Sequence, residues 1–356
     1  MKYLLLPFCL CTFASQASVQ LFHQSVGTTD ITALKSMLKD DWQQAPAADA
    51  SAGFVHQQYG IRWQADSHWQ LQFAKRLTGT VKTDATTAAA YYQLANQQAL
   101  PTAVDIPVQL HFRSIEATGL SLAYQWEYAD WHYQVRLSRW SAQRYRESTV
   151  DGTLNGGKDG AINGLLNFHE YYSHSNFLKR PFQSGDWQQQ GKGYSADLHL
   201  RGQLSSEWWL QLDLQDLYAE IQFEQLGFTQ GQINSQNSFV NDAGYLEFIP
   251  VLQGKEFAEP RTLSLPKQYS LSSGWQLNAD QQLLVQLKRL DQNNQWQVGF
   301  SQQWQQRELQ FWLDPIHRLP GLLFKQQDWL LELAADKSAV RDLKQFRLNL
   351  QIPLWF

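Results

Sequence analysis

LSLAYQWEYADWHYQVRLS, residues 120–138, decides the fold class of this chain of 356 residues. From Leu120 to Tyr128 every second residue is apolar or aromatic, and small or polar residues stand between them. After a turn at residues 129–130 the alternation resumes from Tyr133. A period of two is typical of a β-strand whose two faces meet different surroundings. The stretch therefore predicts two antiparallel strands joined by a tight turn.

The same alternation recurs almost to the last residue. It is regular at residues 198–201, 210–215, 283–287, 296–300, 309–313, 329–333 and 346–356, and less regular at 54–63, 69–77, 108–114, 163–174, 269–277 and 321–325. With the two strands above, these stretches make fifteen candidates. Bacterial single-chain membrane barrels have even strand numbers. We therefore expect an all-β fold, an antiparallel transmembrane β-barrel of about 14 strands within a range of 12–16, with a short N-terminal helix.

The composition fits strands with lipid on one face and a polar lumen on the other. Mean hydropathy is −0.45, and a barrel keeps such a low average because only alternate residues meet lipid. The 15 tryptophans and the 13% aromatic content suit the aromatic girdles of a barrel. A secreted soluble β-sandwich has the same period of two in its half-buried strands and stays as the alternative fold.

The last strand candidate ends in an aromatic residue. Counting back from Phe356, apolar residues take every second position, at Leu354, Ile352, Leu350, Leu348 and Phe346. This pattern resembles the C-terminal assembly signal of Gram-negative outer-membrane β-barrel proteins, although Pro353 and Trp355 depart from a polar inner face. The resemblance implies insertion into outer-membrane lipid by the barrel-assembly machinery. It identifies a class of proteins with no common activity.

Residues 1–17 have the pattern of a signal peptide. Lys2 precedes a short apolar run, and Ser15 and Ala17 stand at the −3 and −1 positions of a cleavage site. We therefore expect export and cleavage after Ala17. Both cysteines, Cys9 and Cys11, fall in this segment, so a cleaved chain would have neither disulfides nor cysteine metal sites.

Residues 18–52 are interpreted as an N-terminal periplasmic segment and residues 53–356 as the barrel. Within the first segment, Thr29 and Asp30 can cap a helix that ends before Pro46, and its apolar stripe consists of Ile31, Leu34, Leu38 and Trp42. Two roles stay open for this helix. It is either a plug or periplasmic docking helix, or a short helix that packs against the barrel mouth.

Three long polar stretches, residues 79–107, 177–193 and 225–268, contrast with tight links between other strand candidates. Barrels place short turns on the periplasmic side and long loops outside. With Phe356 in the periplasm, counting strands backward places residues 225–268 outside, where an external partner would bind. The glycine- and aspartate-rich residues 150–160 lack the ordered ligands of a calcium loop and are interpreted as a flexible loop.

If the apolar set faces lipid, the lumen receives charged residues of both signs. These lumen-facing candidates are Glu127, Arg136, Asp197, Arg201, Asp213, Lys288 and Arg347. A strongly selective pore needs an excess of one sign. The mixture therefore indicates either a weakly selective aqueous channel or a lumen closed by paired charges and amides.

One cluster carries a hint of catalysis: Ser173, His174, Ser175 and Asn176. It resembles the active sites of outer-membrane lipid A deacylases and phospholipases, but His174 directly adjoins Ser175. In a strand, adjacent side chains point to opposite faces, so the pair would not make a nucleophile and base. No catalytic residue is therefore expected. Metal-ligand spacing is missing from the histidines, no cofactor is expected, and the net charge of −4 gives no basic surface for nucleic acid.

Three functions remain. The first is a passive channel or export conduit of the outer membrane. The second is a structural or assembly barrel that binds an envelope or surface-polymer partner. The third and weakest is an outer-membrane lipid hydrolase.

Overall fold

The computed structural model describes residues 18–39, 42–102, 104–157, 162–174, 190–235, 238–240, 246–248 and 252–354. The expected signal peptide, residues 1–17, and the terminal Phe356 lie outside the described residues. In the part that is described, no helix is long and apolar enough to cross a membrane.

The described strands form a closed antiparallel barrel with fourteen positions around its wall. Its first half contains β1 (Ser18–Thr29), β2 (Ala52–Gln64), β3 (Trp69–Thr83), β4 (Ile106–Tyr128), β5 (Trp131–Gly156), β6 (Ile162–Tyr172), β7 (Gly191–Gln203) and β8 (Trp208–Asn234). Its second half contains β11 (Leu252–Ser264), β12 (Gln268–Asn278), β13 (Gln281–Leu290), β14 (Asn293–Trp304), β15 (Arg307–Asp314), β16 (Leu319–Gln326), β17 (Trp329–Ala335) and β18 (Gln345–Leu354). Pairing of β1 with β18 closes the wall. The predicted fold class is confirmed.

Two positions of the wall are each shared by two successive strands. Both β6 and β7 pair with β5 on one side and β8 on the other, at different heights. Likewise β11 pairs with the upper part of β8 and β12 with its lower part. The fifteen candidates become fourteen positions because residues 108–114 and 120–128 lie in one strand, β6 and β7 share a position, and β1 was missed.

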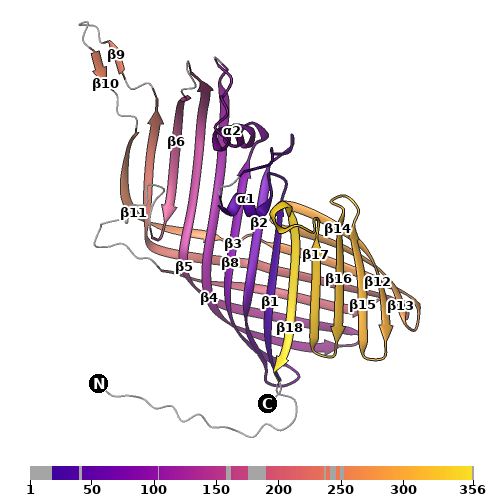
Figure 1. The fold of residues 1–356 in the computed structure, drawn as a ribbon. Helices are drawn as coiled ribbons and strands as arrows, with labels where there is room; N and C mark the ends of the chain where they lie inside the picture. The colour runs from indigo at the N-terminus through magenta and orange to yellow at the C-terminus, as the bar shows by residue number, and fades with distance from the viewer. Residues whose placement is uncertain are drawn as a thin grey trace, which may run out of the picture.

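The wall is much taller on one side. In Figure 1, β5, β6, β8 and β11 rise well beyond the short strands β13 to β17. We call the end with the tight hairpins, such as the one between β4 and β5, the turn end, and the end with the tall strands the loop end. At the loop end lie α1 (Leu34–Lys39), α2 (Ala85–Ala95), the short helix η2 (Val340–Asp342) and the two-stranded sheet of β9 (Ser238–Val240) and β10 (Leu246–Phe248).

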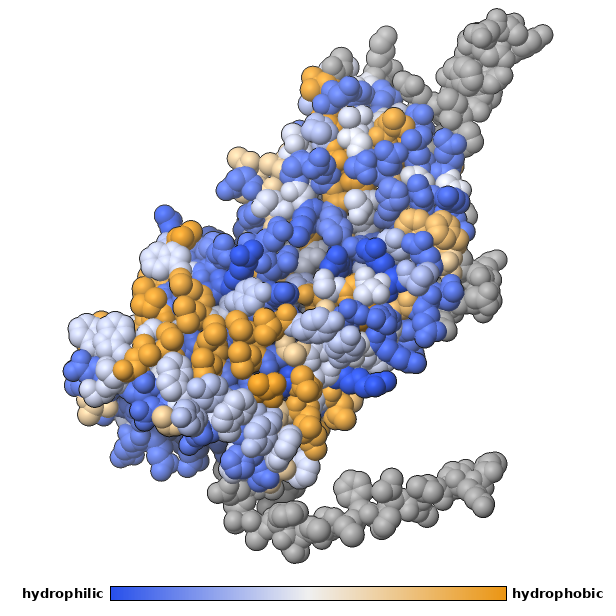
Figure 2. Space-filling view, turned by 180° about the vertical axis from the view of Figure 1, so that it is seen from behind, coloured by the Kyte–Doolittle hydropathy of each residue, from blue (hydrophilic) through white to orange (hydrophobic). Residues whose placement is uncertain are grey.

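The alternation of the sequence separates an outer from an inner face. On β4, Leu120 is 58% exposed and its neighbour Ser121 is 2% exposed. Apolar side chains gather on the lower, barrel part of the surface, whereas the taller part is mostly hydrophilic (Figure 2). Because exposed apolar side chains alternate with buried polar ones around a closed wall, the fold is that of a membrane-spanning barrel.

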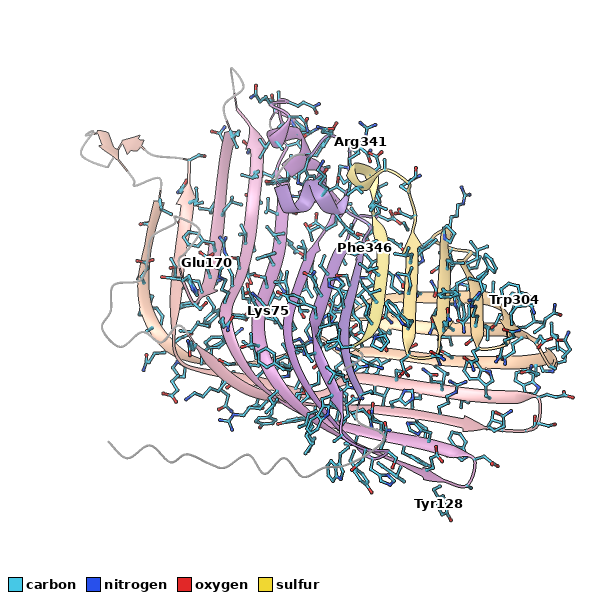
Figure 3. All side chains as sticks on the ribbon, turned by 60° about the horizontal axis from the view of Figure 1, so that its bottom comes forward. Lys75, Tyr128, Glu170, Trp304, Arg341 and Phe346 are labelled. Carbon is cyan, nitrogen blue, oxygen red and sulfur yellow. The ribbon has the colours of Figure 1, made fainter. Side chains whose placement is uncertain are left out.

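Aromatic and charged side chains mark the edges of the apolar belt. Trp63, Trp69 and Trp208 are exposed beside hairpins of the turn end, and Figure 3 shows Tyr128 and Trp304 at the same end. Toward the loop end, Lys75 forms an ion pair with Glu116 on the outer face. A charge at the membrane midplane costs about 2–4 kcal/mol, so this ion pair marks the edge of the belt.

The boundary expected at residue 52 is wrong. Residues 18–29 form the barrel strand β1, and α1 has six residues and lies at the loop end. The alternation of β1 is blurred because Phe22 is buried in the interior, where the pattern of the other strands would place a polar residue. Ile31 packs in a buried cluster with Ala50 and Ala88, so the segment after β1 packs against α2 at the loop end.

Two expected loops are also corrected. Most of residues 225–268 belongs to β8 and β11, and most of residues 79–107 to β3, α2 and β4. The glycine-rich stretch continues β5 to Gly156. Strands above the membrane have no lipid-facing side, so they lack the apolar alternation that reveals the lower strands. Of residues 177–193, only 190–193 are described.

Candidate functional site: a polar chamber inside the barrel

The barrel encloses a chamber of about 970 Å³. Its lining comes from strands on all sides of the wall, and thirteen of the lining residues are glutamines. Because glutamine amides both donate and accept hydrogen bonds without carrying charge, the chamber offers polar contacts to water and hydrophilic solutes. On β13 the lining includes residues from Gln282 near the turn end to Leu290 near the loop end, so the chamber extends along the short side.

The structure brings six of the seven lumen-facing candidates to this chamber. They are Arg136, Asp197, Arg201, Asp213, Lys288 and Arg347. Glu127 lies instead beside a smaller cavity of about 300 Å³ near the turn end, with its side chain 83% exposed. The charges therefore share one space with the amides, although they come from strands far apart in sequence.

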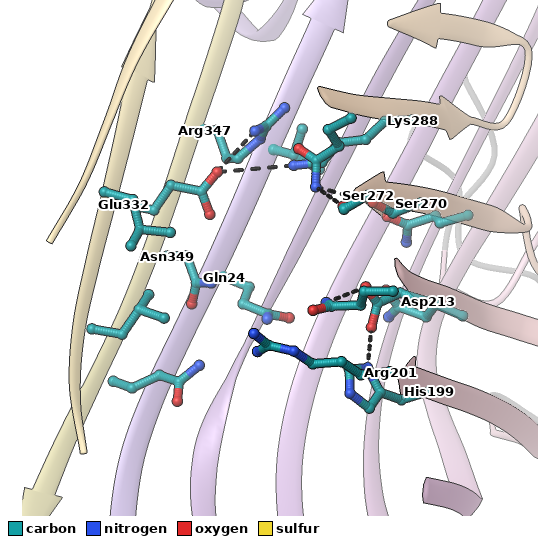
Figure 4. A pocket seen from close by; sticks show the side chains of 18 of the residues that line it. Gln24, His199, Arg201, Asp213, Ser270, Ser272, Lys288, Glu332, Arg347 and Asn349 are labelled. Atoms are coloured by element: carbon teal, nitrogen blue, oxygen red, sulfur yellow. Dashed lines mark hydrogen bonds and ion pairs between the residues drawn. The ribbon is translucent and has the colours of Figure 1, made fainter. Parts of the chain in front are cut away.

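On the short side, one carboxylate contacts two cationic side chains. Glu332 Oε1 lies 2.8 Å from Arg347 Nη1 and 3.9 Å from Lys288 Nζ, which joins β17, β18 and β13 (Figure 4). The same Arg347 nitrogen donates to Gln297 Oε1 at 3.1 Å. Removal of one partner of a buried ion pair leaves the other charge unpaired, which is costly. These contacts therefore hold β13, β17 and β18 together on the short side.

A second pair lies on the tall side of the chamber. His199 Nδ1 is 2.5 Å from Asp213 Oδ1, and Gln211 Nε2 donates to Asp213 Oδ2 at 2.8 Å. These residues stand on neighbouring strands, β7 and β8, and all three line the chamber. Both oxygens of Asp213 are thus engaged.

The chamber is bounded toward the loop end, along β3 to β8, by a layer of buried side chains. Arg76 Nη2 from β3 meets Asp216 Oδ2 from β8 at 2.7 Å, and Arg76 Nη1 meets Oδ1 at 3.0 Å. Their side chains are 1% and 0% exposed. The Arg76 guanidinium also lies 4.9 Å from the ring centre of Trp140 on β5. We call Arg76, Asp216 and the buried apolar cluster around Trp140, which includes Ile115, Tyr145 and Phe223, the loop-side layer.

A bulge in β8 brings the Asp216 carboxylate within reach of Arg76. Asp216 has a positive φ of 55°, and the register between β7 and β8 shifts there. Aspartate tolerates this left-handed conformation better than most residues. The Asp216 backbone N–H donates to Asp197 Oδ1 at 2.8 Å, which holds the bulge against β7. The bulge therefore directs a carboxylate inward toward a strand four positions away.

Above the membrane belt, Glu147 is the centre of a polar cluster that joins β4, β5 and β11. Its carboxylate accepts from Arg261 Nη2 at 2.7 Å, Arg113 Nη2 at 3.0 Å and the Tyr145 hydroxyl at 2.6 Å, and lies 3.0 Å from His111 Nε2. Burial alone would raise the pKa of the Glu147 carboxyl. Hydrogen bonds from His111 and Tyr145 and the charge of Arg113 outweigh burial and hold that pKa well below its ordinary value.

The serine and histidine cluster, for which catalysis is not expected, is only partly described. Ser173 and His174 lie just beyond the end of β6, and Ser173 Oγ is 3.0 Å from His174 Nδ1. Strand alternation therefore does not separate these two side chains. Ser173 is fully buried and its Oγ also accepts the Tyr145 N–H at 2.9 Å, so it holds β5 in place. Ser175 and Asn176 lie outside the described residues.

Sequence reasoning missed Arg62, Arg76 and Asp216. Arg62 and Arg76 fall in strands whose alternation is less regular, and Asp216 follows Gln215 directly, so two polar residues interrupt the alternation of β8. That interruption was the only signal of the bulge. Among the described residues, no group of three or more histidine, cysteine or acidic side chains could hold a metal ion.

Comparisons with known proteins give structural likeness without sequence relatives. No family model and no curated protein sequence matches the chain. A TodX mutant described as a monoaromatic hydrocarbon channel is 11% identical, with 96% of this chain and 90% of that chain covered and a TM-score of 0.46. The toluene transporter TodX of Pseudomonas putida is 11% identical, with 96% and 89% covered and a TM-score of 0.41.

The translocator domain of the autotransporter NalP from Neisseria meningitidis is 7% identical, with 96% of this chain and 88% of that chain covered and a TM-score of 0.32. At these identities and TM-scores the likeness assigns neither an activity nor a cargo to this chain. The barrel fold rests on the strand pairing of the chain itself.

Proposed function

We propose that this chain is a passive channel of the outer membrane that conducts water and small hydrophilic solutes. The observation that carries the proposal is the polar chamber on the short side of the barrel, whose lining includes residues from Gln282 to Leu290 on β13. The loop-side layer fills the interior along the tall strands, so we place the conducting path toward the loop end along β12 to β18, where the lining reaches Leu290. Amides and paired charges give this path polar walls without a strong barrier for uncharged solutes.

Placement in the outer membrane is part of the proposal. Leu350, Ile352 and Leu354 belong to β18, where their even-numbered positions alternate with the chamber-lining Asn349 and Gln351. This alternation supports both contact with outer-membrane lipid and recognition by the barrel-assembly machinery. A barrel that conducts passively needs no catalytic residue, and we propose no enzymatic activity.

Conductance across a planar lipid bilayer tests the proposal. The refolded protein should give discrete conductance steps. Gln286→Trp, which fills the chamber on β13, should reduce the step size, because the indole occupies space that water and ions use. Val285→Trp is the matched control, since Val285 is exposed on the outer face of the same strand. Absence of steps, or equal reduction by both variants, would contradict a channel along this path.

A second candidate function is an assembly barrel that binds an envelope or surface-polymer partner. The observation in its favour is β11, which in the described part of the chain pairs with β8 alone and has its other edge unpaired. Such an edge can accept a strand from a partner. A barrel that gives no conductance steps, but in which Gly254→Pro on β11 abolishes co-purification of a surface polymer or envelope protein, would favour this function over a channel.

A further inference from the structure

One wall of the chamber carries more hydrogen-bond donors than acceptors. Arg62 on β2 donates through Nε and Nη2 to Gln72 Oε1, both at 3.4 Å. Arg136 on β5 donates through Nη2 to Gln70 Oε1 at 3.2 Å. Gln70 and Gln72 are two residues apart on one face of β3, which spaces these anchoring points about 7 Å apart. Two guanidinium groups therefore face the chamber from neighbouring positions.

The lining as a whole has an excess of positive charge. It contains six lysines and arginines but four aspartates and glutamates. Lys288 and Arg347 share the carboxylate of Glu332. Arg136 Nη1 lies 3.8 Å from Asp197 Oδ2. Lys325 stands directly opposite Glu308 on the neighbouring strand.

Three lining cations form no ion pair among the described residues: Arg62, Arg201 and Lys325. Of these, Lys325 stands opposite a carboxylate residue on the neighbouring strand, whereas Arg62 and Arg201 do not. Among the described residues, neither has a carboxylate oxygen within ion-pair distance. Arg62 lies over the ring of Phe22 at 4.9 Å, and Arg201 over the ring of Trp209 at 5.0 Å. The aromatic faces orient these guanidinium groups without neutralising them.

Two buried donors on the same wall lack an acceptor within the described protein. Gln72 is 2% exposed and lines the chamber, yet its Nε2 has no hydrogen-bond partner. Arg136 Nε is also unpartnered. A buried donor without an acceptor is costly, so the wall is suited to a group that brings acceptor oxygens with it.

We propose that Arg62, Arg136, Arg201 and Gln72 form an anion site that recognises the carboxylate or phosphate group of a small solute inside the chamber. The proposal deepens the channel function proposed above by naming the class of solute. Guanidinium groups bind oxyanions through paired, charge-assisted hydrogen bonds. The surplus charge makes the conduit favour small anions over cations.

Calorimetric titration of the refolded protein in a neutral detergent at low salt tests this site. Inorganic phosphate and gluconate serve as separate probes for the two oxyanion groups. We expect saturable binding of at least one probe in the parent protein. The double variant Arg62→Gln with Arg201→Gln should bind the probe at least about tenfold more weakly, since it removes charge-assisted hydrogen bonds. Lys325→Gln removes one charge from the far side of the chamber and should bind nearly as the parent does.

Heat-modifiable migration in gels shows that each variant has folded. Binding of phosphate alone or gluconate alone supports the site and identifies its oxyanion. No saturable binding, or equal binding by the parent and the double variant, overturns the anion site even if the barrel conducts. A barrel that gives no conductance steps but binds a probe through these arginines supports the site and contradicts the conduit.

Discussion

At the scale of single residues, glycines make room for tryptophan rings on the barrel wall. Gly119, Gly274 and Gly299 stand directly opposite Trp140, Trp209 and Trp312 on neighbouring strands. An added Cβ at each glycine would lie 2.3–2.7 Å from the opposite indole. A glycine weakens a strand by itself, and an aromatic ring laid over it compensates for the missing side chain.

Gly119→Ala should therefore destabilise the barrel. Its Cβ would lie 2.3 Å from the Trp140 ring and 2.8 Å from the Arg139 carbonyl oxygen, and Trp140 is held in the loop-side layer. We expect a loss of about 1–3 kcal/mol, the usual cost of overpacking. Urea unfolding in detergent measures it. Gly79→Ala is the control, because its nearest neighbour is 3.8 Å away, and equal losses in both variants would contradict the role of the ring contact.

The alternation placed several charged residues on the inner face, but it did not predict their partners. Arg136, Asp213 and Lys288 could be placed from the apolar residues beside them. Arg76 and Asp216 meet across four wall positions through a bulge that breaks the alternation, so a periodic pattern contains no information about their contact. The arginine and aromatic pairs of the chamber, such as Arg201 with Trp209, depend in the same way on strand register.

At the scale of elements, the tall strands are held together by polar side chains. Arg261 ties β11 to Glu147 on β5, and the Tyr171 hydroxyl on β6 donates to Glu259 on β11 at 2.7 Å. Burial and the hydrogen bond to Glu259 raise the pKa of Tyr171 to about 12, so its phenol keeps its proton. These strands have no apolar alternation, which is why sequence reasoning took much of this region for loops.

The attachment of β11 should weaken in acid. Because the folded pKa of Glu147 lies below its unfolded value, its contribution is present above the unfolded pKa, about 4.3 for glutamate, and is lost as pH falls toward the folded value. Protection of β11 amides from hydrogen exchange, corrected for intrinsic rates, should therefore fall below about pH 4.

Glu147→Gln should lower the protection of β11 at neutral pH, by about 1–3 kcal/mol, because Arg113 and Arg261 lose their anionic acceptor. It should also flatten the acid dependence. Glu127→Gln, at an exposed carboxylate of the turn end, is the control and should keep the parent profile. Identical pH profiles for Glu147→Gln and the parent protein would show that another group controls the attachment of β11.

At the scale of the whole molecule, closure of the wall explains the architecture. No described strand of the barrel belt between β1 and β18 has a free edge, so backbone groups are paired without water. The period of two predicted this closed wall, because it requires lipid outside and a polar interior. It could not predict the height difference between the two sides or the chamber that results from it.

The most direct test of the account is the exposure of adjacent residues of β13 to water and lipid. Val285→Cys and Gln286→Cys should be prepared in a chain without residues 1–17, which hold both natural cysteines, and refolded into vesicles. A charged, membrane-impermeant thiol reagent should label Gln286→Cys, in the chamber, much faster than Val285→Cys, on the lipid face. Equal labelling, or faster labelling of Val285→Cys, would contradict a water-accessible interior behind a lipid-facing wall.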